Sequence, residues 1–144
     1  MVVRNVTLTD YPALTNMDWS PLTRPPTALF AYYVMDQSHV CLVAENYKNQ
    51  LLGALVAYRS SNGKNIHLAA MKSLESGVGV GRALVTTLQG ICPRIGAERI
   101  WLFTTADVRG FYEKMGFTVG ALGIFQEAMV DGLMVMEWTS GHTE

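Results

Sequence analysis

Apolar and polar positions along the first 37 residues predict one strand and two helices. Val2 to Leu8 alternates well enough for a strand, in which successive side chains point to opposite faces. Thr9 or Asp10 can cap a short helix that runs to about Trp19. Residues 20–26 contain three prolines and predict a loop, after which Thr27 to Gln37 places apolar side chains on one helical face.

The rest of the chain predicts six more strands and two helices. The strands are expected at His39 to Glu45, Leu51 to Arg59, Asn65 to Met71, Glu98 to Thr105 (a buried strand), Phe117 to Leu122 and Gly132 to Thr139; the helices at 82–92, before Pro93, and at Val108 to Met115, ended by Gly116. The first two of these strands read as an antiparallel hairpin. This order implies a mixed sheet of six to seven strands covered on both sides by about four helices, an α/β (α+β) domain.

Composition supports one domain over residues 1–144 and excludes several partners. Half of the positions (49%) are hydrophobic and only 16% are charged, so the chain can bury a core without metal or disulfide support. The formal net charge of −1 provides no general attraction to nucleic acid or to an anionic membrane. Any anionic ligand must therefore be bound by local groups.

The sequence also lacks clear signals for membrane insertion, for secretion and for metal binding. The longest uncharged apolar run, Ala28 to Met35, is far shorter than the roughly 20 residues that span a bilayer. The first residues lack the pattern of a signal peptide, so we expect a cytoplasmic protein. Cys41 and Cys92 lie in apolar runs and are expected to be buried free thiols, and no zinc-binding spacing occurs, so we expect no metal.

The most informative segment is Gly77-Val78-Gly79-Val80-Gly81, a turn between a predicted strand and a predicted helix. Alternate glycines allow backbone N–H groups to point inward, and the following helix adds its positive dipole end, so the turn can hold an anion such as pyrophosphate. A P-loop needs Gly-Lys-Ser/Thr where the chain has Gly81-Arg82-Ala83. A Rossmann fingerprint needs a third glycine where Arg82 stands. A tight turn with no ligand remains the alternative.

About thirty residues later comes a second segment, Phe111-Tyr112-Glu113-Lys114-Met115-Gly116-Phe117. Together, this segment and residues 77–84 resemble the two signature segments of the GNAT superfamily of acyl-CoA-dependent N-acyltransferases. The element order is also similar, so the resemblance covers nearly the whole chain. It implies a mixed, mostly antiparallel sheet that is splayed between its fourth and fifth strands, with acyl-CoA in the gap.

The resemblance also implies which residues bind acetyl-CoA, the expected cosubstrate. Backbone groups of the fourth strand would pair with pantetheine, here those of Ala69, Ala70 and Met71. Backbone N–H groups of the glycine turn would bind the pyrophosphate, here those of Ser76, Gly77, Val78, Gly79, Val80, Gly81 and Arg82. Ser76 replaces the usual Gln or Arg, so phosphate affinity would depend more on Arg82 and Lys72. Thr105 replaces an Asn that contacts the cofactor in relatives.

Two residues are candidates for proton transfer. Tyr112 matches the family tyrosine that serves as general acid for the leaving thiolate, and the N–H of Met71 can meet the thioester carbonyl. Asn65 stands where some relatives have a catalytic glutamate, and it cannot accept a proton. His67 follows on the same strand face and is the candidate base, although a strand histidine with only structural hydrogen bonds is an equal alternative.

The acceptor is not identified by the residues. Trp19, Tyr33 and Phe125 can form an aromatic wall, and Asp18 or Glu127 can supply a carboxylate for an ammonium group. We expect an acetyl-CoA-dependent N-acetyltransferase that acts on a primary amine of a small molecule or peptide by direct attack in a ternary complex. A homodimer stays open. The alternatives are an acyl-CoA-binding sensor without turnover and an unrelated nucleotide-binding domain.

Overall fold

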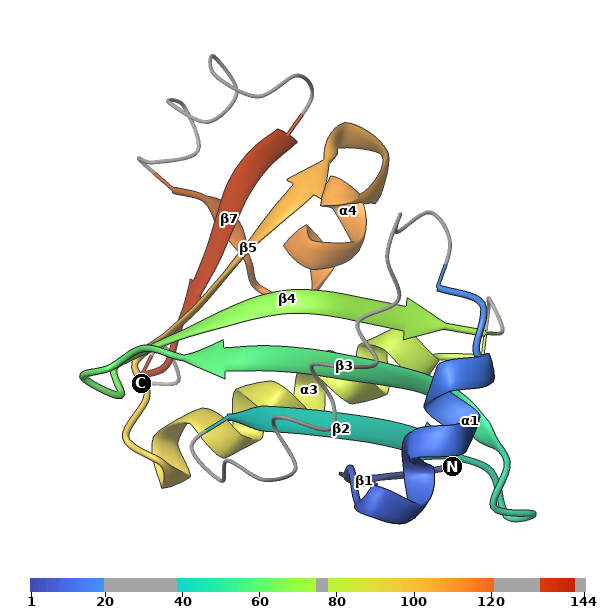
Figure 1. Cartoon of the computed structure of the whole chain (residues 1–144). Helices are drawn as coiled ribbons and strands as arrows, with labels where there is room; N and C mark the ends of the chain where they lie inside the picture. The colour runs from blue at the N-terminus through green and yellow to red at the C-terminus, as the bar shows by residue number, and fades with distance from the viewer. Residues whose placement is uncertain (20–38, 75–77, 121–132, 142–144) are drawn as a thin grey trace.

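The computed structural model describes residues 1–19, 39–74, 78–120 and 133–141, and these residues form one seven-stranded sheet (Figure 1). The strand order is β1-β2-β3-β4-β5-β7-β6, and every neighbouring pair is antiparallel except β4–β5. The strands are β1 (Val2–Asn5), β2 (Val40–Glu45), β3 (Leu51–Arg59), β4 (Asn65–Ser73), β5 (Arg99–Thr105), β6 (Thr118–Val119) and β7 (Leu133–Thr139). The mixed, mostly antiparallel sheet predicted from the sequence is confirmed.

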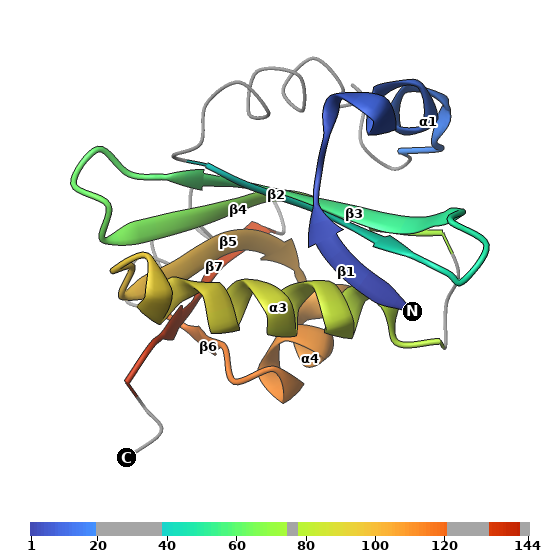
Figure 2. The same ribbon diagram turned by 90° about the horizontal axis from the view of Figure 1, so that it is seen from below.

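Helices cover both faces of this sheet. The described helices are the 3-10 helix η1 (Leu8–Asp10) and the α-helices α1 (Tyr11–Asn16), α3 (Val80–Arg94) and α4 (Ala106–Lys114). Figure 2 shows α1 on one face, with α3 and α4 on the other. The helix predicted at Thr27 to Gln37 lies outside the described residues. None of the described helices is long and apolar enough to span a membrane.

Two apolar cores result from this arrangement. The larger core places Leu84 and Leu88 of α3 against the buried face that includes Leu55, Ile66 and Ile100. The smaller core packs Leu14 of α1 and other buried side chains against the opposite face: Val6, Trp19, Cys41, Val43, Ala54 and Val56. Because β2 and β3 contribute side chains to both cores, their sequences are apolar at nearly every position.

Several predicted boundaries differ from the observed ones. The strand predicted to Leu8 ends at Asn5, and Leu8 begins η1 instead. The helix expected to stop before Pro93 continues to Arg94, with Pro93 inside its last turn. The strand predicted at Phe117 to Leu122 is described only as the short β6. Proline and strand signals are local, whereas the exact ends of elements depend on neighbouring packing.

The prediction that Glu98 to Thr105 forms a buried strand is correct for only one of the two faces of β5. In β5 the buried residues Ile100, Leu102 and Thr104 alternate with the less buried Arg99, Trp101, Phe103 and Thr105. Ile100 and Leu102 face the larger core, and Phe103 is 43% exposed on the other side. Large aromatic side chains on the more exposed face made the strand look continuously apolar.

Candidate active site

The parallel pairing between β4 and β5 is short, and the two strands then diverge. The pairing covers Asn65 with Arg99, Ile66 with Ile100, and His67 with Trp101. Beyond this point β4 continues to Ser73 beside β3, and β5 continues to Thr105 beside β7. Figure 1 shows β5 and β7 turning away from β4. The predicted splay is confirmed, and within the described parts of the chain no strand pairs with Leu68 to Met71 on the β5 side of β4.

A β-bulge in β4 marks the point of divergence. Val56 of β3 pairs with Ala70, but the next residue, Ala57, pairs with Leu68, so Ala69 is an extra residue in β4. A bulge bends its strand and increases the local twist. Ala69 follows the last residue paired with β5, His67, by two positions. The bulge therefore explains why β4 leaves β5 here, and it lies within the segment predicted to bind pantetheine.

The described end of the glycine turn, Val78 to Arg82, leads directly into α3. Gly79 precedes the helix with a φ of +78°, a left-handed conformation that favours glycine. The first turn is closed by the N–H of Ala83, which donates to the carbonyl of Gly79 at 3.0 Å. The backbone N–H groups before Ala83 have no carbonyl partner within the helix. They give the α3 N-terminus the donors and the positive dipole end that an anion requires.

Gly81 connects three predicted parts of the site. A methyl group on Gly81 would lie 3.4 Å from Cζ of Phe111 in α4 and 3.6 Å from Cε of Met71 in β4. The start of α3, the divergent half of β4 and the aromatic segment of α4 therefore meet at one place. Arg82, next in the chain, is exposed, whereas Val80 is buried against the core. Ser76 and Gly77, also predicted to bind the cofactor, lie outside the described residues.

Tyr112 is buried in α4 beside this junction. Its side chain is 7% exposed, and its ring makes edge contacts with Phe111 at 5.0 Å and with Phe117 at 5.4 Å between centroids. Burial raises the pKa of the Tyr112 hydroxyl to about 12. The phenol is therefore neutral at physiological pH and can donate a hydrogen bond or a proton.

His67 lies at the last β4–β5 pair and is half-buried. Its ring stacks on Trp101 with centroids 3.9 Å apart and an interplanar angle of 19°. Its Nδ1 lies 3.4 Å from the carbonyl oxygen of Trp101. Burial lowers the pKa of His67, and the contact with the Trp101 carbonyl opposes this effect only in part. The imidazole is therefore neutral near pH 7 and able to accept a proton.

The remaining predicted site residues have different settings. Thr105 stands at the N-cap position of α4 without a side-chain capping bond; its hydroxyl donates to a carboxylate oxygen of Asp107, and its oxygen can still accept a hydrogen bond. Trp19 is 2% exposed in the smaller core, and its indole N–H donates to the carbonyl of Leu14 at 2.9 Å. Tyr33, Phe125 and Glu127 lie outside the described residues.

The two cysteines are buried, as expected. Burial raises the pKa of Cys41 to about 12 and that of Cys92 to about 11. Both thiols are therefore protonated at neutral pH and are poor nucleophiles. In the described segments no three His, Cys, Asp or Glu side chains lie close enough together to hold a metal ion.

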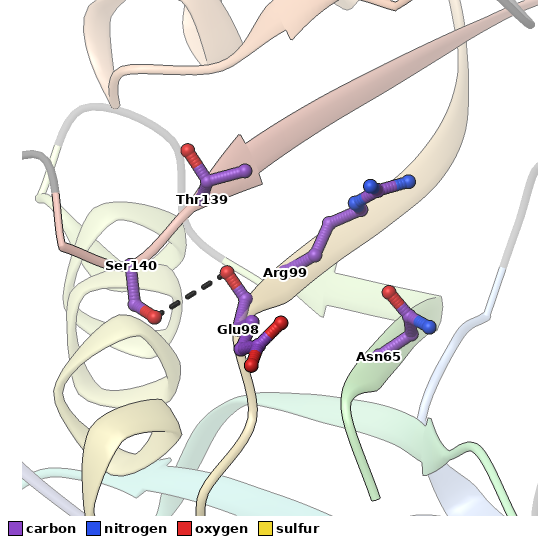
Figure 3. A pocket seen from close by; sticks show the side chains of 5 residues that line it. All are labelled: Asn65, Glu98, Arg99, Thr139 and Ser140. Carbon is purple, nitrogen blue, oxygen red and sulfur yellow. Dashed lines mark hydrogen bonds between the residues drawn. The ribbon is translucent and has the colours of Figure 1, made fainter. Parts of the chain in front are cut away.

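A polar cavity of about 260 Å³ lies at the opposite, paired end of β4 and β5 (Figure 3). It is lined by Asn65, Glu98, Arg99, Thr139 and Ser140. Glu98 forms an ion pair with Lys64 at 3.1 Å, and Arg99 forms one with Glu137 at 3.4 Å. The Ser140 hydroxyl donates to the carbonyl of Glu98 at 3.3 Å. The charged side chains of this cavity are thus already paired with protein groups, and none of the predicted cofactor-binding residues lines it.

Sequence reasoning missed the aromatic side chains around His67. Tyr58 of β3 stacks near His67 with centroids 5.8 Å apart, and Phe103 approaches edge-on at 5.9 Å. Trp101 and Phe103 alternate with buried residues along β5, which is a period-2 signal present in the sequence. The Ala69 bulge has no comparable signal, because nothing in Leu68-Ala69-Ala70 distinguishes the extra residue.

Comparison with known proteins gives concordant results. The family model of the acetyltransferase (GNAT) family matches residues 3–117. An acetyltransferase of the GNAT family from Staphylococcus aureus Mu50 has a TM-score of 0.77 at 15% identity, with 96% of this chain and 98% of that chain covered. An aminoglycoside 6'-N-acetyltransferase complexed with coenzyme A has a TM-score of 0.74 at 15% identity, covering 96% and 97%.

A putative acetyltransferase from Salmonella typhimurium, with its cofactor acetyl-CoA, has a TM-score of 0.71 at 20% identity, covering 99% of this chain and 96% of that chain. At these identities the structural similarity shows a shared fold. A search of curated proteins found no match.

Proposed function

The chain belongs to the acetyltransferase (GNAT) family, and we propose that it transfers an acetyl group from acetyl-CoA to a primary amine of a small molecule or peptide. The observation that carries this proposal is the divergence of β4 from β5 at the Ala69 bulge, beside the first turn of α3. Among the described residues, this geometry brings a stretch of β4 without a paired strand next to a helix end whose N–H groups can bind an anion. A cosubstrate with an amide-containing arm and a pyrophosphate matches both features.

The residues present fit acetyl-CoA as the cosubstrate. The β4 edge at Ala69, Ala70 and Met71 can pair with the pantetheine amides in the way an added strand pairs with a sheet. The first-turn N–H groups of α3 would hold the pyrophosphate, with Ser76 and Gly77 on the preceding turn. Arg82 is exposed and would add the positive charge that Ser76 does not provide.

In the proposed reaction, His67 accepts a proton from the ammonium group of the acceptor. The free amine then attacks the thioester carbonyl directly, in a ternary complex. The N–H of Met71 stabilises the negative charge that develops on the carbonyl oxygen. The hydroxyl of Tyr112 donates toward the leaving sulfur, so the products are an N-acetylated amine and coenzyme A with a protonated thiol.

The environments of His67 and Tyr112 support these opposite roles. The lowered pKa of His67 leaves its imidazole neutral and able to take up a proton. The pKa of about 12 keeps the Tyr112 phenol protonated until negative charge appears nearby. The ring of Tyr112 is held by Phe111 and Phe117, which limits the positions of its hydroxyl.

A second candidate function is an acyl-CoA sensor that binds without turnover. Two observations favour it: Ser76 brings no charge to the phosphate turn, and Asn65, where relatives have a carboxylate, lines the cavity at the paired end of β4. The two functions share a cofactor site and differ only in chemistry.

Thermal shift and a thiol-release assay distinguish these functions. We expect acetyl-CoA, but neither ATP nor NAD, to raise the Tm, and at least one amine in a panel of polyamines, aminoglycosides, amino acids and peptide N-termini to release coenzyme A. Stabilisation with no turnover on the whole panel supports the sensor. The absence of any stabilisation by acetyl-CoA rejects both functions.

A further inference from the structure

His67 is the centre of a row of rings that crosses three neighbouring strands. Tyr58 of β3 and Trp101 of β5 are its register partners on the two sides, and both rings lie nearly parallel to the imidazole, at 24° and 19°. The Trp101 ring is much closer, at 3.9 Å between centroids, against 5.8 Å for Tyr58. The imidazole is therefore held mainly from the β5 side, at the final residue pair before the strands diverge.

We propose that Trp101 is a positioning residue for the acetyl transfer: its ring fixes the plane of His67, and its carbonyl fixes the tautomer, leaving Nε2 as the proton acceptor. This inference rests on the proposed function, in which His67 is the base. The carbonyl oxygen of Trp101 lies 3.4 Å from Nδ1 of His67 and can only accept a hydrogen bond. In the neutral ring the proton therefore belongs on Nδ1, and Nε2 keeps its lone pair.

The stack and the hydrogen bond act on the same ring from the same residue. A carbonyl alone allows the imidazole to rotate about the hydrogen bond, whereas a parallel indole restricts the ring to one plane. Phe103 adds an edge contact on the same strand, at 5.9 Å and 84°. A base that is held in plane loses less entropy when it reaches the acceptor nitrogen.

Among the described residues, the side chains that surround the His67 imidazole are mostly uncharged rings. The rings that contact it from β3 and β5 are those of Tyr58, Trp101 and Phe103, none of which is a carboxylate or a basic group. Beyond Tyr58 lies His39, whose ring contacts Tyr58 edge-on. On the far side of Trp101, the residue of β7 in register with Trp101 is Glu137, which forms an ion pair with Arg99. Among the described groups, the Trp101 carbonyl is therefore the one placed to determine the tautomer.

The test combines imidazole NMR with kinetics on the full chain. Long-range proton–nitrogen spectra report which imidazole nitrogen carries the proton, and the His67→Gln variant identifies the His67 signals among the three histidines. We expect Nδ1–H as the major tautomer in the unmodified protein. Trp101→Leu keeps the backbone carbonyl and should therefore keep the Nδ1–H tautomer, but the loss of the stacked ring should lower kcat about tenfold with the KM for acetyl-CoA unchanged. Trp101→Phe retains a stacked ring and should restore kcat to within about twofold.

Three results would contradict the positioning role of Trp101. A fourth result would contradict the proposed role of His67 as the base. Nε2–H as the major tautomer of unmodified protein contradicts the proposal without any variant, even if Trp101→Leu does not fold. A folded Trp101→Leu protein with unchanged kcat also contradicts it, as does a Trp101→Phe protein as impaired as Trp101→Leu. Unchanged turnover in His67→Gln instead removes His67 as the base, and leaves the tautomer measurement as a separate result.

Discussion

The two ends of the β4–β5 pair differ in how fully the protein satisfies its own polar groups. At the paired end, Asn65 to His67 lie in register with β5, and the surrounding charges form ion pairs within the protein. At the divergent end, the β4 edge after His67 has no paired strand in the described chain, and the start of α3 offers N–H donors without helical partners. The change occurs over two residues, from His67 to Ala69.

This difference shows why a visible cavity is a poor guide to the site here. The cavity at the paired end is polar, but its charged side chains already have partners, so a ligand would have to compete with existing ion pairs. The divergent end offers the backbone groups of β4 and of the first turn of α3, with Arg82 exposed beside them. A chain with a net charge of −1 can bind an anionic cosubstrate in this way, because backbone N–H groups and a helix dipole need no net positive charge.

The largest expected effect at the divergent end is that of Tyr112→Phe. This change removes only the hydroxyl, so the ring contacts with Phe111 and Phe117 and the fold should be kept. We expect kcat to fall about 100-fold, a typical effect of losing a general acid, with acetyl-CoA binding nearly unchanged. Thiol-release kinetics and calorimetric titration measure the two quantities. Equal kcat values in both proteins would exclude Tyr112 as the acid.

The pH dependence of turnover tests His67 at the boundary between the two ends. Burial lowers the pKa of His67 below the ordinary value of about 6.5, and the proposed mechanism requires its neutral form. As the pH falls through this lowered pKa, kcat/KM should decrease, and above it the His67 contribution should be constant. His67→Gln should lower kcat/KM and remove this acid limb. A profile with the same acid limb in His67→Gln would assign the limb to another group.

Substitutions at Gly81 test whether acetyl-CoA binding requires the close contact between α3, α4 and β4. Gly81→Ala should be tolerated, because the added methyl lies at ordinary contact distance from Phe111 and Met71. Gly81→Val adds two further carbons at this junction and should weaken acetyl-CoA binding about tenfold, or about 1.4 kcal/mol. Calorimetric titration of both variants provides a matched pair. Equal affinities of the two variants for acetyl-CoA would mean that acetyl-CoA binding does not depend on the contact between these three elements.

The smallest effect is expected at the paired end. Arg99→Ala removes the ion pair with Glu137, in which both side chains are partly exposed, at 45% and 30%. Such pairs contribute at most about 1 kcal/mol to the free energy of unfolding. We expect kcat and acetyl-CoA affinity to change less than about twofold, with a small decrease in Tm. A loss of turnover as large as that of His67→Gln would contradict the prediction that the paired end has no role in catalysis.

Much of the fold was predictable because its signals are local. The hairpin of β2 and β3 follows from two β-rich runs around Asn46 to Gln50, and the structure confirms their antiparallel pairing. Gly116, predicted to end a helix, has a φ of +91° just after α4. The glycine turn was found from its spacing alone, and Gly79 has the positive φ that only glycine adopts easily.

The site was less predictable because its contacts are not local. His67 and Trp101 are 34 positions apart, and no local pattern relates them. The bulge at Ala69 depends on how β3 and β4 align over their whole length, because each face of β3 must meet its own core. The large apolar side chains on both faces of β5 conceal in the sequence the alternation that places Trp101 beside His67.

Local sequence is enough to predict the order of elements, the glycine-rich turn before α3 and the tyrosine in α4, because backbone conformation and periodicity depend on neighbouring residues. The point where β4 leaves β5, the stacking of Trp101 on His67 and the meeting of Gly81, Met71 and Phe111 arise in the tertiary structure. These features depend on strand register and on packing between distant segments. The register between two strands is determined by the need to bury both faces of the sheet at once. The sequence of one strand alone does not specify its alignment with the next.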